Sequence, residues 1–226
     1  MDSKYDDEKY VEQRLKVRTH RQVVGGLWDE IGTLQFEFMK QRGLRPESLL
    51  LDVGCGALRG GVKFVEYLNG ERYFGIDVSQ SLLEAGYAQE ISPRQDLADK
   101  LPRGNLQCID TFDAVPFGKE FDYALAHSVF THLTLNSIRL CLENLAEVVK
   151  PGGKFCATYF RIPDDQATGV PQQQQLGIIT HGYRDPYHYR VADFQYVIRG
   201  LPWVLEDELE WGHPRGQRML VFSKPG

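Results

Sequence analysis

The sequence is poor in sulfur and lacks a long apolar run. It has four cysteines among 226 residues: Cys55, Cys108, Cys141 and Cys156. Their wide spacing forms neither a disulfide framework nor a CxxC metal pair, so we expect no disulfide-stabilised scaffold and no zinc site. No apolar run approaches the roughly 20 residues that cross a bilayer, and residues 1–7 are too polar for a secretory signal. These absences predict a cytoplasmic protein with no membrane partner and no bound metal.

An excess of positive charge is also absent. The chain has 26 Lys and Arg against 31 Asp and Glu, for a net charge of -5. Proteins that bind nucleic acid usually carry a basic excess, so we expect no nucleic-acid partner. The basic residues within 14–21 are interpreted as a solvated helix face. With 42% apolar residues and no internal repeat, the chain is expected to form one domain with a substantial core. Its oligomeric state is left open.

One stretch combines a buried strand with a glycine turn. The apolar run at 49–51 is typical of a strand covered on both faces in a parallel sheet. Asp52 ends this strand, and Gly54 and Gly56 allow a tight turn that a ligand can approach closely. Apolar residues at helical spacing follow over 61–69. Because such a turn leads into a helix N-terminus, its backbone N–H groups are expected to point at a bound cofactor.

The next two predicted strands also end in carboxylates. Asp77 closes a strand about 20 residues after Gly56, the separation expected for an acidic residue that receives a ribose diol. A carboxylate suits this role because it accepts two hydrogen bonds. The alternative is that Asp77 caps the following helix. Asp110 closes a third short strand over 106–110.

Strands and helices alternate through the middle of the chain. Further strands are predicted at 121–127 and 154–160, and a helix at 137–149, which indicates a doubly wound parallel α/β sheet. Strands at 203–211 and 217–223 are expected to close the chain as an antiparallel hairpin. Before the sheet, Leu27, Ile31, Leu34 and Phe38 have the spacing of an amphipathic helix. Residues 161–189 have little periodicity and are interpreted as a lid or binding segment.

Residues 49–160 resemble the class I S-adenosylmethionine-dependent methyltransferases. The motifs that carry the resemblance are Leu51-Asp52-Val53-Gly54-Cys55-Gly56, Gly75-Ile76-Asp77, Asp110, Phe121-Asp122-Tyr123 and Val149-Lys150-Pro151-Gly152-Gly153-Lys154. The resemblance implies a Rossmann-like seven-stranded sheet with an antiparallel last strand. It also implies a single methyltransferase domain over 1–226, with an N-terminal helical cap at 1–47 and a substrate lid at 161–189. Leu58 departs from the family pattern, which usually has a third glycine at that place.

The resemblance assigns S-adenosylmethionine as the cofactor and gives its contacts. Asp52 would hold the amino end through water, while Gly54 and Gly56 would let the backbone pass the methionine and ribose portion. Asp77 would bind the ribose diol, and Val78 would pack on adenine. The full set of implied cofactor contacts is Asp52, Gly54, Cys55, Gly56, Asp77, Val78, Asp110, Thr111 and His127.

The acceptor side is expected at the end of the fourth strand and in the lid. His127 and His132 follow that strand and are the candidates for a general base, because imidazole titrates near pH 7. The aromatic and imidazole side chains of the lid are candidate substrate contacts: His181, Tyr183, Tyr187 and His188. The fourth strand ends without the Asn/Asp-Pro-Pro-aromatic motif of methyltransferases that act on DNA amines. We therefore expect the hydroxyl or amine of a small molecule as the methyl acceptor.

Two other interpretations remain open. A turn reading Gly54-x-Gly56-x-x-x-Gly60 also occurs in nicotinamide-binding folds, which would make the protein an NAD(P)-dependent oxidoreductase. The third interpretation is a non-catalytic protein that binds S-adenosylmethionine. Asp52 favours the methyltransferase over the oxidoreductase, because a carboxylate suits a ligand with a cationic amine and disfavours a pyrophosphate.

Overall fold

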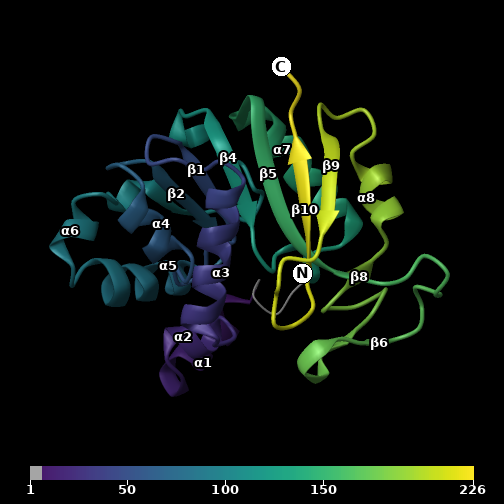
Figure 1. Ribbon diagram of the computed structural model, residues 1–226. Coiled ribbons are helices and arrows are strands. Elements are labelled where there is room, and N and C mark those ends of the chain that lie inside the picture. Colours follow the sequence, from purple (N-terminus) through teal and green to yellow (C-terminus); the bar gives the residue numbers. More distant parts are fainter. Residues whose placement is uncertain (1–6) are drawn as a thin grey trace. The chain divides into compact units, whose positions relative to one another are not determined.

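A computed structural model describes residues 7–226 of the chain (Figure 1). The chain divides into two compact units, the first ending at Asp110 and the second comprising Thr111–Gly226. The first six residues of the predicted N-terminal cap lie outside the described residues. The expectation of a single domain stays a prediction. Within the described residues, no helix is long and apolar enough to cross a membrane.

The first unit begins with three helices, which are α1 (Glu8–Val17), α2 (His20–Val23) and α3 (Trp28–Gln41). Gly25 and Gly26 interrupt the helical backbone before α3. Their φ angles are 94° and 66°, values that glycine adopts readily. Leu27 precedes α3 in a left-handed conformation and is 37% exposed. The expectation that Leu27 belongs to the buried stripe of this helix is wrong. The glycine pair has turned its side chain away from the face that buries Ile31 and Phe38.

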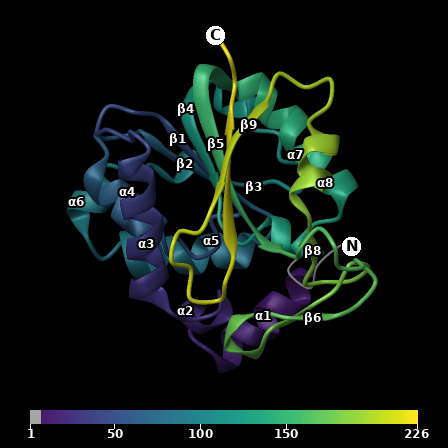
Figure 2. The same cartoon turned by 45° about the vertical axis from the view of Figure 1, so that its right-hand side comes forward.

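Three parallel strands form the sheet of the first unit. In spatial order they are β3 (Leu106–Cys108), β2 (Tyr73–Asp77) and β1 (Leu50–Val53). All residues of β1 and β2 are buried, as the apolar sequence predicted. The helices between them are α4 (Gly61–Tyr67), α5 (Gln80–Gly86) and α6 (Gln95–Ala98). A π-helical turn, η2 (Tyr87–Ile91), continues α5, and α1 and α2 both contact α5 (Figure 2).

The second unit contains the reversed strand that was expected. Its strands run in the order β4 (Phe121–Ala126), β5 (Val149–Arg161), β10 (Arg218–Ser223) and β9 (Val204–Leu209). β4 and β5 are parallel, whereas β10 is antiparallel to both β5 and β9 (Figure 1). Its α-helices are α7 (Leu135–Val148), which Thr134 caps, and α8 (Val191–Val197). The predicted α/β class, with parallel strands and an antiparallel last strand, is confirmed.

Segment 161–189 has more regular structure than its sequence suggested. β6 (Gln172–Gln173) and β7 (Ile179–Thr180) form a small antiparallel pair, and β8 (His188–Tyr189) pairs with the end of β5. Short 3-10 turns complete the described elements: η3 (Arg103–Asn105), η4 (Val115–Phe117), η5 (Phe130–His132) and η6 (Gln175–Gly177). The segment is therefore anchored to the sheet of the second unit through β8.

Candidate functional site

The glycine turn after β1 is shaped by hydrogen bonds to β2. The N–H groups of Gly54 and Cys55 both donate to the carbonyl oxygen of Ile76, at 2.8 and 3.1 Å. These two donors are therefore used within the protein, and the expectation that N–H groups of this turn face a cofactor stays a prediction for the rest of the turn. Gly54 itself is exposed, with a φ of 69°. The turn offers a close backbone approach at Gly54 and no side chain to block it.

Asp77 ties the end of β2 to this turn. Its two carboxylate oxygens accept the N–H of Gly56 at 2.7 Å and the N–H of Ser79 at 2.9 Å. Asp77 is only 8% exposed, and burial raises the pKa of its carboxyl group to about 6, although the hydrogen bonds from Ser79 and Gly56 oppose this shift. Each carboxylate oxygen has a second acceptor position. Asp77 thus supports the turn and still has the capacity to accept hydroxyl groups.

Asp52, on the neighbouring strand, is also buried. Its Oδ2 accepts the hydroxyl of Tyr73 at 2.7 Å. Burial raises the pKa of Asp52 to about 7; the Tyr73 hydrogen bond and Arg59 oppose the rise, and the charge of Asp77 adds to it. Both carboxyl groups of this corner therefore have pKa values above the usual range of aspartate.

Leu58 stands where the family pattern has its third glycine, yet it takes a glycine-like conformation. Its φ is 67° and its side chain is fully buried. Space for it comes from Gly61, where an added Cβ would lie 3.1 Å from the Leu58 Cβ and 2.6 Å from the Tyr73 hydroxyl. The left-handed conformation of Leu58 costs about 1–2 kcal/mol.

A carboxylate that the sequence did not single out lies beside Asp77. Glu8 of α1 accepts the Ser79 hydroxyl at 2.6 Å, and the N–H and hydroxyl of Ser81 at 2.8 and 2.6 Å. Burial raises the pKa of Glu8, but these hydrogen bonds outweigh it and lower the pKa below its usual value. The charge of Glu8 in turn helps to raise the pKa of Asp77. No sequence pattern links residues so far apart in the chain.

The other predicted cofactor residues occupy varied positions. Val78 is half-buried directly after β2, and its carbonyl accepts the Cys108 thiol at 3.4 Å. Cys55 is buried, and its sulfur lies 2.7 Å from where a Cβ on Gly75 would be. Asp110 is exposed two residues after β3, and Thr111 is the exposed first residue of the second unit. Their roles toward a cofactor stay predictions.

In the second unit, His132 forms a pair with Asp185. The His132 Nδ1 lies 2.5 Å from Asp185 Oδ1, and the two side chains are 23% and 17% exposed. His132 belongs to η5, whereas Asp185 belongs to segment 161–189. A carboxylate on Nδ1 fixes the orientation of the imidazole ring and its tautomer. The sequence identified His132 as a candidate base but not the partner that orients it.

His127 has different surroundings. It is 7% exposed, and its ring centroid lies 5.8 Å from that of Trp211 and 5.2 Å from that of His213. Next to it, Ser128 donates its hydroxyl to Gln217 Oε1 at 3.0 Å. His127 is thus packed in an aromatic cluster, and its predicted catalytic and cofactor roles stay untested.

The predicted substrate contacts of segment 161–189 do not share one environment. His188 is buried, with Nδ1 3.0 Å from the Thr180 hydroxyl and Nε2 3.0 Å from the Thr168 carbonyl. Both ring nitrogens are therefore engaged in holding the segment together. Tyr183 is 65% exposed, whereas His181 and Tyr187 are buried. Among residues 7–226, no group of three His, Cys, Asp or Glu side chains is arranged to hold a metal ion.

Comparison with known proteins identifies what the chain resembles. Residues 51–155 match the family described as methyltransferase domain. The chain is 27% identical over 149 residues to the 18S rRNA (guanine(1575)-N(7))-methyltransferase of Saccharomyces cerevisiae, covering 62% of this chain and 50% of that protein. It is 31% identical over 127 residues to the demethylmenaquinone methyltransferase of Symbiobacterium thermophilum, covering 53% and 45%. The chain thus spans about half the length of the curated relatives that it matches.

A solved structure extends the likeness to nearly the whole chain. An S-adenosylmethionine-dependent methyltransferase from Clostridium acetobutylicum has a TM-score of 0.65 and 12% identity, covering 96% of this chain and 98% of that one. At this identity the likeness concerns the fold. It confirms the predicted Rossmann-like architecture.

One relative overturns an expectation drawn from composition. The exclusion of nucleic-acid partners was based on the net charge of -5. A relative that acts on rRNA contradicts that exclusion. Net charge averages over the chain, whereas a nucleic acid meets a local surface. The exposed residues Lys16 and Arg18 show that positive charge can be concentrated locally.

Proposed function

We propose that this chain, whose residues 51–155 match the methyltransferase domain family, is a class I S-adenosylmethionine-dependent methyltransferase. It binds this cofactor in its first unit and transfers the methyl group to an acceptor. The observation that carries the proposal is the joining of Gly56 to Asp77 at the carboxyl ends of β1 and β2. Open α/β sheets bind their ligands at this edge. When bound, S-adenosylmethionine supplies a methyl group that its sulfonium already makes electrophilic.

The residues of the first unit suit this cofactor. Asp77 has free acceptor positions for the two ribose hydroxyls, and it is already oriented by Gly56 and Ser79. Gly54 leaves the turn open to close approach. The buried carboxyl of Asp52 gives the same corner a preference for positive charge over a pyrophosphate. These features favour S-adenosylmethionine over the nicotinamide alternative.

In the second unit, we assign the acceptor side to His132 and Asp185. Asp185 holds the ring through Nδ1, so Nε2 is the atom that would take a proton from the acceptor. A general base in this arrangement typically contributes 10²- to 10⁴-fold to the rate. A nitrogen or oxygen nucleophile that must lose a proton would use it, whereas one that carries no proton would not.

For the acceptor class, we propose RNA. The rRNA-modifying relative supports this proposal, and so does the basic run that ends α1 and leads into α2, where Lys16 and Arg18 are exposed. Arginine and lysine side chains in such a run contact phosphates. The −5 net charge does not prevent this, because such contacts depend on the local surface.

The test is transfer of a radioactive methyl group. The full chain is incubated with [methyl-³H]S-adenosylmethionine and purified rRNA, with DNA and a protein extract in parallel. Label in RNA would support the RNA assignment, and loss of that label in the His132→Gln variant would support the role of His132 as a base. Arg94→Gln is the matched control, because Arg94 forms only exposed ion pairs. Label only in protein or DNA would overturn the RNA assignment, and no label in any fraction together with no cofactor binding would overturn the proposed function.

A further inference from the structure

Arg59 lies inside the glycine-rich turn but is bonded to a distant part of the chain. Its Nη1 donates to the carbonyl oxygens of Val24 and Gly26, at 3.0 and 3.1 Å. Arg59 is 9% exposed. An arginine is rarely this buried unless its guanidinium has partners. The residue therefore links the turn to the segment of residues 8–27, which we name the N-terminal strap.

The N-terminal strap lies directly on the turn. A Cβ added to Gly56 would be 3.2 Å from the Val24 Cγ1 and 4.0 Å from Asp77 Oδ2. Val11 and Val23 of the strap form one buried apolar cluster with Ala57 of the turn and Leu82 of α5. Asp77, which the ribose has to reach, is 8% exposed. A nucleoside therefore cannot meet this carboxylate fully until the protein atoms over it move.

Polar anchors hold the strap at both ends. Near its start, Glu8 accepts hydrogen bonds from Ser79 and Ser81. Farther along, Glu90 of η2 lies 2.5 Å from the His20 Nε2 and accepts Arg21 Nε and Nη2 at 2.7 and 2.8 Å. A π-helical turn such as η2 is often found at functional sites. Hydrogen bonds to carboxylates are strong but reversible, as a segment that opens and recloses requires.

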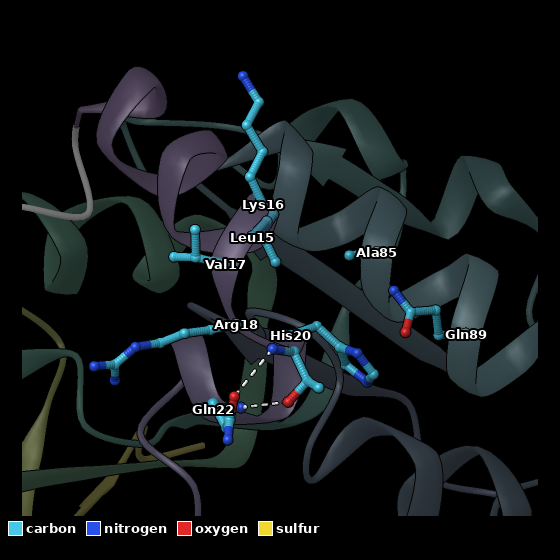
Figure 3. A pocket seen from close by; sticks show the side chains of 9 residues that line it. Leu15, Lys16, Val17, Arg18, His20, Gln22, Ala85 and Gln89 are labelled. Atoms are coloured by element: carbon cyan, nitrogen blue, oxygen red, sulfur yellow. Dashed lines mark hydrogen bonds between the residues drawn. The ribbon is translucent and has the colours of Figure 1, made fainter.

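Beside its apolar cluster, the strap also borders an open space. An open cavity of about 460 Å³ lies where the α1–α2 connection meets α5 and η2 (Figure 3). Its lining includes Lys16, Arg18, Gln22 and Gln89. Val17, the last residue of α1, is 78% exposed. An open interface and exposed side chains of this kind lower the free-energy cost of local opening.

We propose that Arg59 is a positioning residue that holds the N-terminal strap closed over the cofactor turn, and that S-adenosylmethionine enters and S-adenosylhomocysteine leaves when the strap lifts. The nucleoside identity rests on the proposed function. Arg59 acts through the strap, since its hydrogen bonds go to the strap carbonyls. The strap then sets the rate of nucleoside exchange. Asp77 and Gly56 provide the contacts to the nucleoside, and the strap covers them.

The experiment follows strap opening and ligand exchange separately. Hydrogen exchange of the amides in residues 8–27 is measured without ligand, and the dissociation rate of S-adenosylhomocysteine is measured by stopped flow. Trp28 fluorescence reports the strap, because the His20 ring packs edge-on against Trp28 at 5.4 Å and the Arg21 guanidinium lies 4.8 Å from its ring centroid. A Trp28→Phe variant identifies that signal among the three tryptophans.

Arg59→Gln is expected to raise both the strap exchange rate and the dissociation rate by about tenfold, the result of losing about 1.4 kcal/mol. Arg59→Lys should restore part of the effect, because an ammonium group can still donate to one carbonyl. Glu8→Gln weakens a different anchor and should change both rates in the same direction. Arg94→Gln, the exposed control, should change neither.

Wild-type rates in Arg59→Gln and Glu8→Gln would overturn the proposal. Faster strap exchange with an unchanged dissociation rate would also overturn it, because the strap would then not control the ligand. If S-adenosylhomocysteine does not bind to the wild-type chain, the proposed function is wrong, and the proposal that the N-terminal strap controls nucleoside exchange is wrong with it. The exchange measured without ligand then shows separately whether Arg59 holds the strap.

Discussion

Gly56 and Asp77 are joined by a single short hydrogen bond, from the glycine N–H to the aspartate Oδ2 at 2.7 Å. This bond makes the glycine turn and the end of β2 one rigid corner. Gly56 has a φ of 54°, and Asp77 is held from the other side by Ser79. The position of the ribose carboxylate is therefore set before a nucleoside arrives, which lowers the entropy lost on binding.

A methyl group at Gly56 tests the rigidity of this corner. Gly56→Ala would strain the left-handed backbone by about 1–2 kcal/mol and would push its Cβ to 3.2 Å from the Val24 Cγ1. We expect a lower melting temperature and an affinity for S-adenosylhomocysteine at least about tenfold weaker.

Gly118→Ala is the matched control for that variant. Gly118 has a similar φ of 60° but nothing within 4 Å of its added Cβ, so it shows the backbone strain alone. Adding Val24→Ala to Gly56→Ala should recover part of the affinity. Equal losses of affinity in the two glycine variants would contradict the account of the corner.

The raised pKa of Asp52 predicts how stability depends on pH. Between pH about 4 and pH about 7 the folded chain keeps a proton on Asp52 that the unfolded chain has lost. The free energy of unfolding therefore falls as pH rises through this window, and the loss is complete above it. Asp52→Asn removes the titration, so the variant should gain up to about 4 kcal/mol relative to wild type between pH 4 and pH 8.

Urea denaturation at several pH values checks this prediction. Asp96→Asn, at an exposed carboxylate, is the control and should show no such gain. A stability difference between Asp52→Asn and wild type that stays constant from pH 4 to pH 8 would contradict the raised pKa.

Cofactor affinity should also depend on pH. Burial raises the pKa of Asp77 to about 6, and the ionised carboxylate is the form that accepts both ribose hydroxyls. The affinity for S-adenosylhomocysteine should therefore rise with pH below about 6, by up to tenfold per pH unit, and level off above 7. Calorimetric titration from pH 5 to pH 8 measures the slope, and a flat profile would show that Asp77 does not titrate with the ligand.

The pair of His132 and Asp185 predicts a separation of binding from catalysis. Asp185→Asn keeps the size of the side chain but loses the charge that orients the His132 ring at 2.5 Å. We expect the turnover number on a proton-bearing acceptor to fall about 10- to 100-fold, with the affinity for S-adenosylhomocysteine unchanged. A fall in both values together would assign the pair to folding instead of acceptor chemistry.

The features predicted from the sequence are those that depend on neighbours in the chain. Apolar runs ending in Asp52 and Asp77 define buried parallel strands, and both strands lie where expected. The hairpin that closes the chain is likewise confirmed, because its two strands are separated by a short turn rich in glycine. Local patterning and turn chemistry are sufficient for such elements.

The features that the sequence missed depend on contacts between distant residues. Glu8 accepts a hydrogen bond from Ser81, which lies 73 positions away in the chain, and Arg59 donates one to Val24, which lies 35 positions away. Asp185 meets His132 across 53. No periodicity connects such residues, so only the folded chain reveals them. His188 is the reverse case, because its sequence context suggests a ligand contact whereas the fold engages both of its ring nitrogens.

The central claim is that Asp77 grips the ribose of S-adenosylmethionine, and isothermal titration with S-adenosylhomocysteine tests it most directly. The wild-type chain should bind this ligand and not NADH. Asp77→Ala should remain folded, but its free energy of unfolding should fall by about 1–3 kcal/mol because the Gly56 and Ser79 N–H groups lose their acceptor. Its affinity for S-adenosylhomocysteine should fall at least about 100-fold. Unchanged affinity in Asp77→Ala, or binding of NADH in place of S-adenosylhomocysteine, would contradict the account.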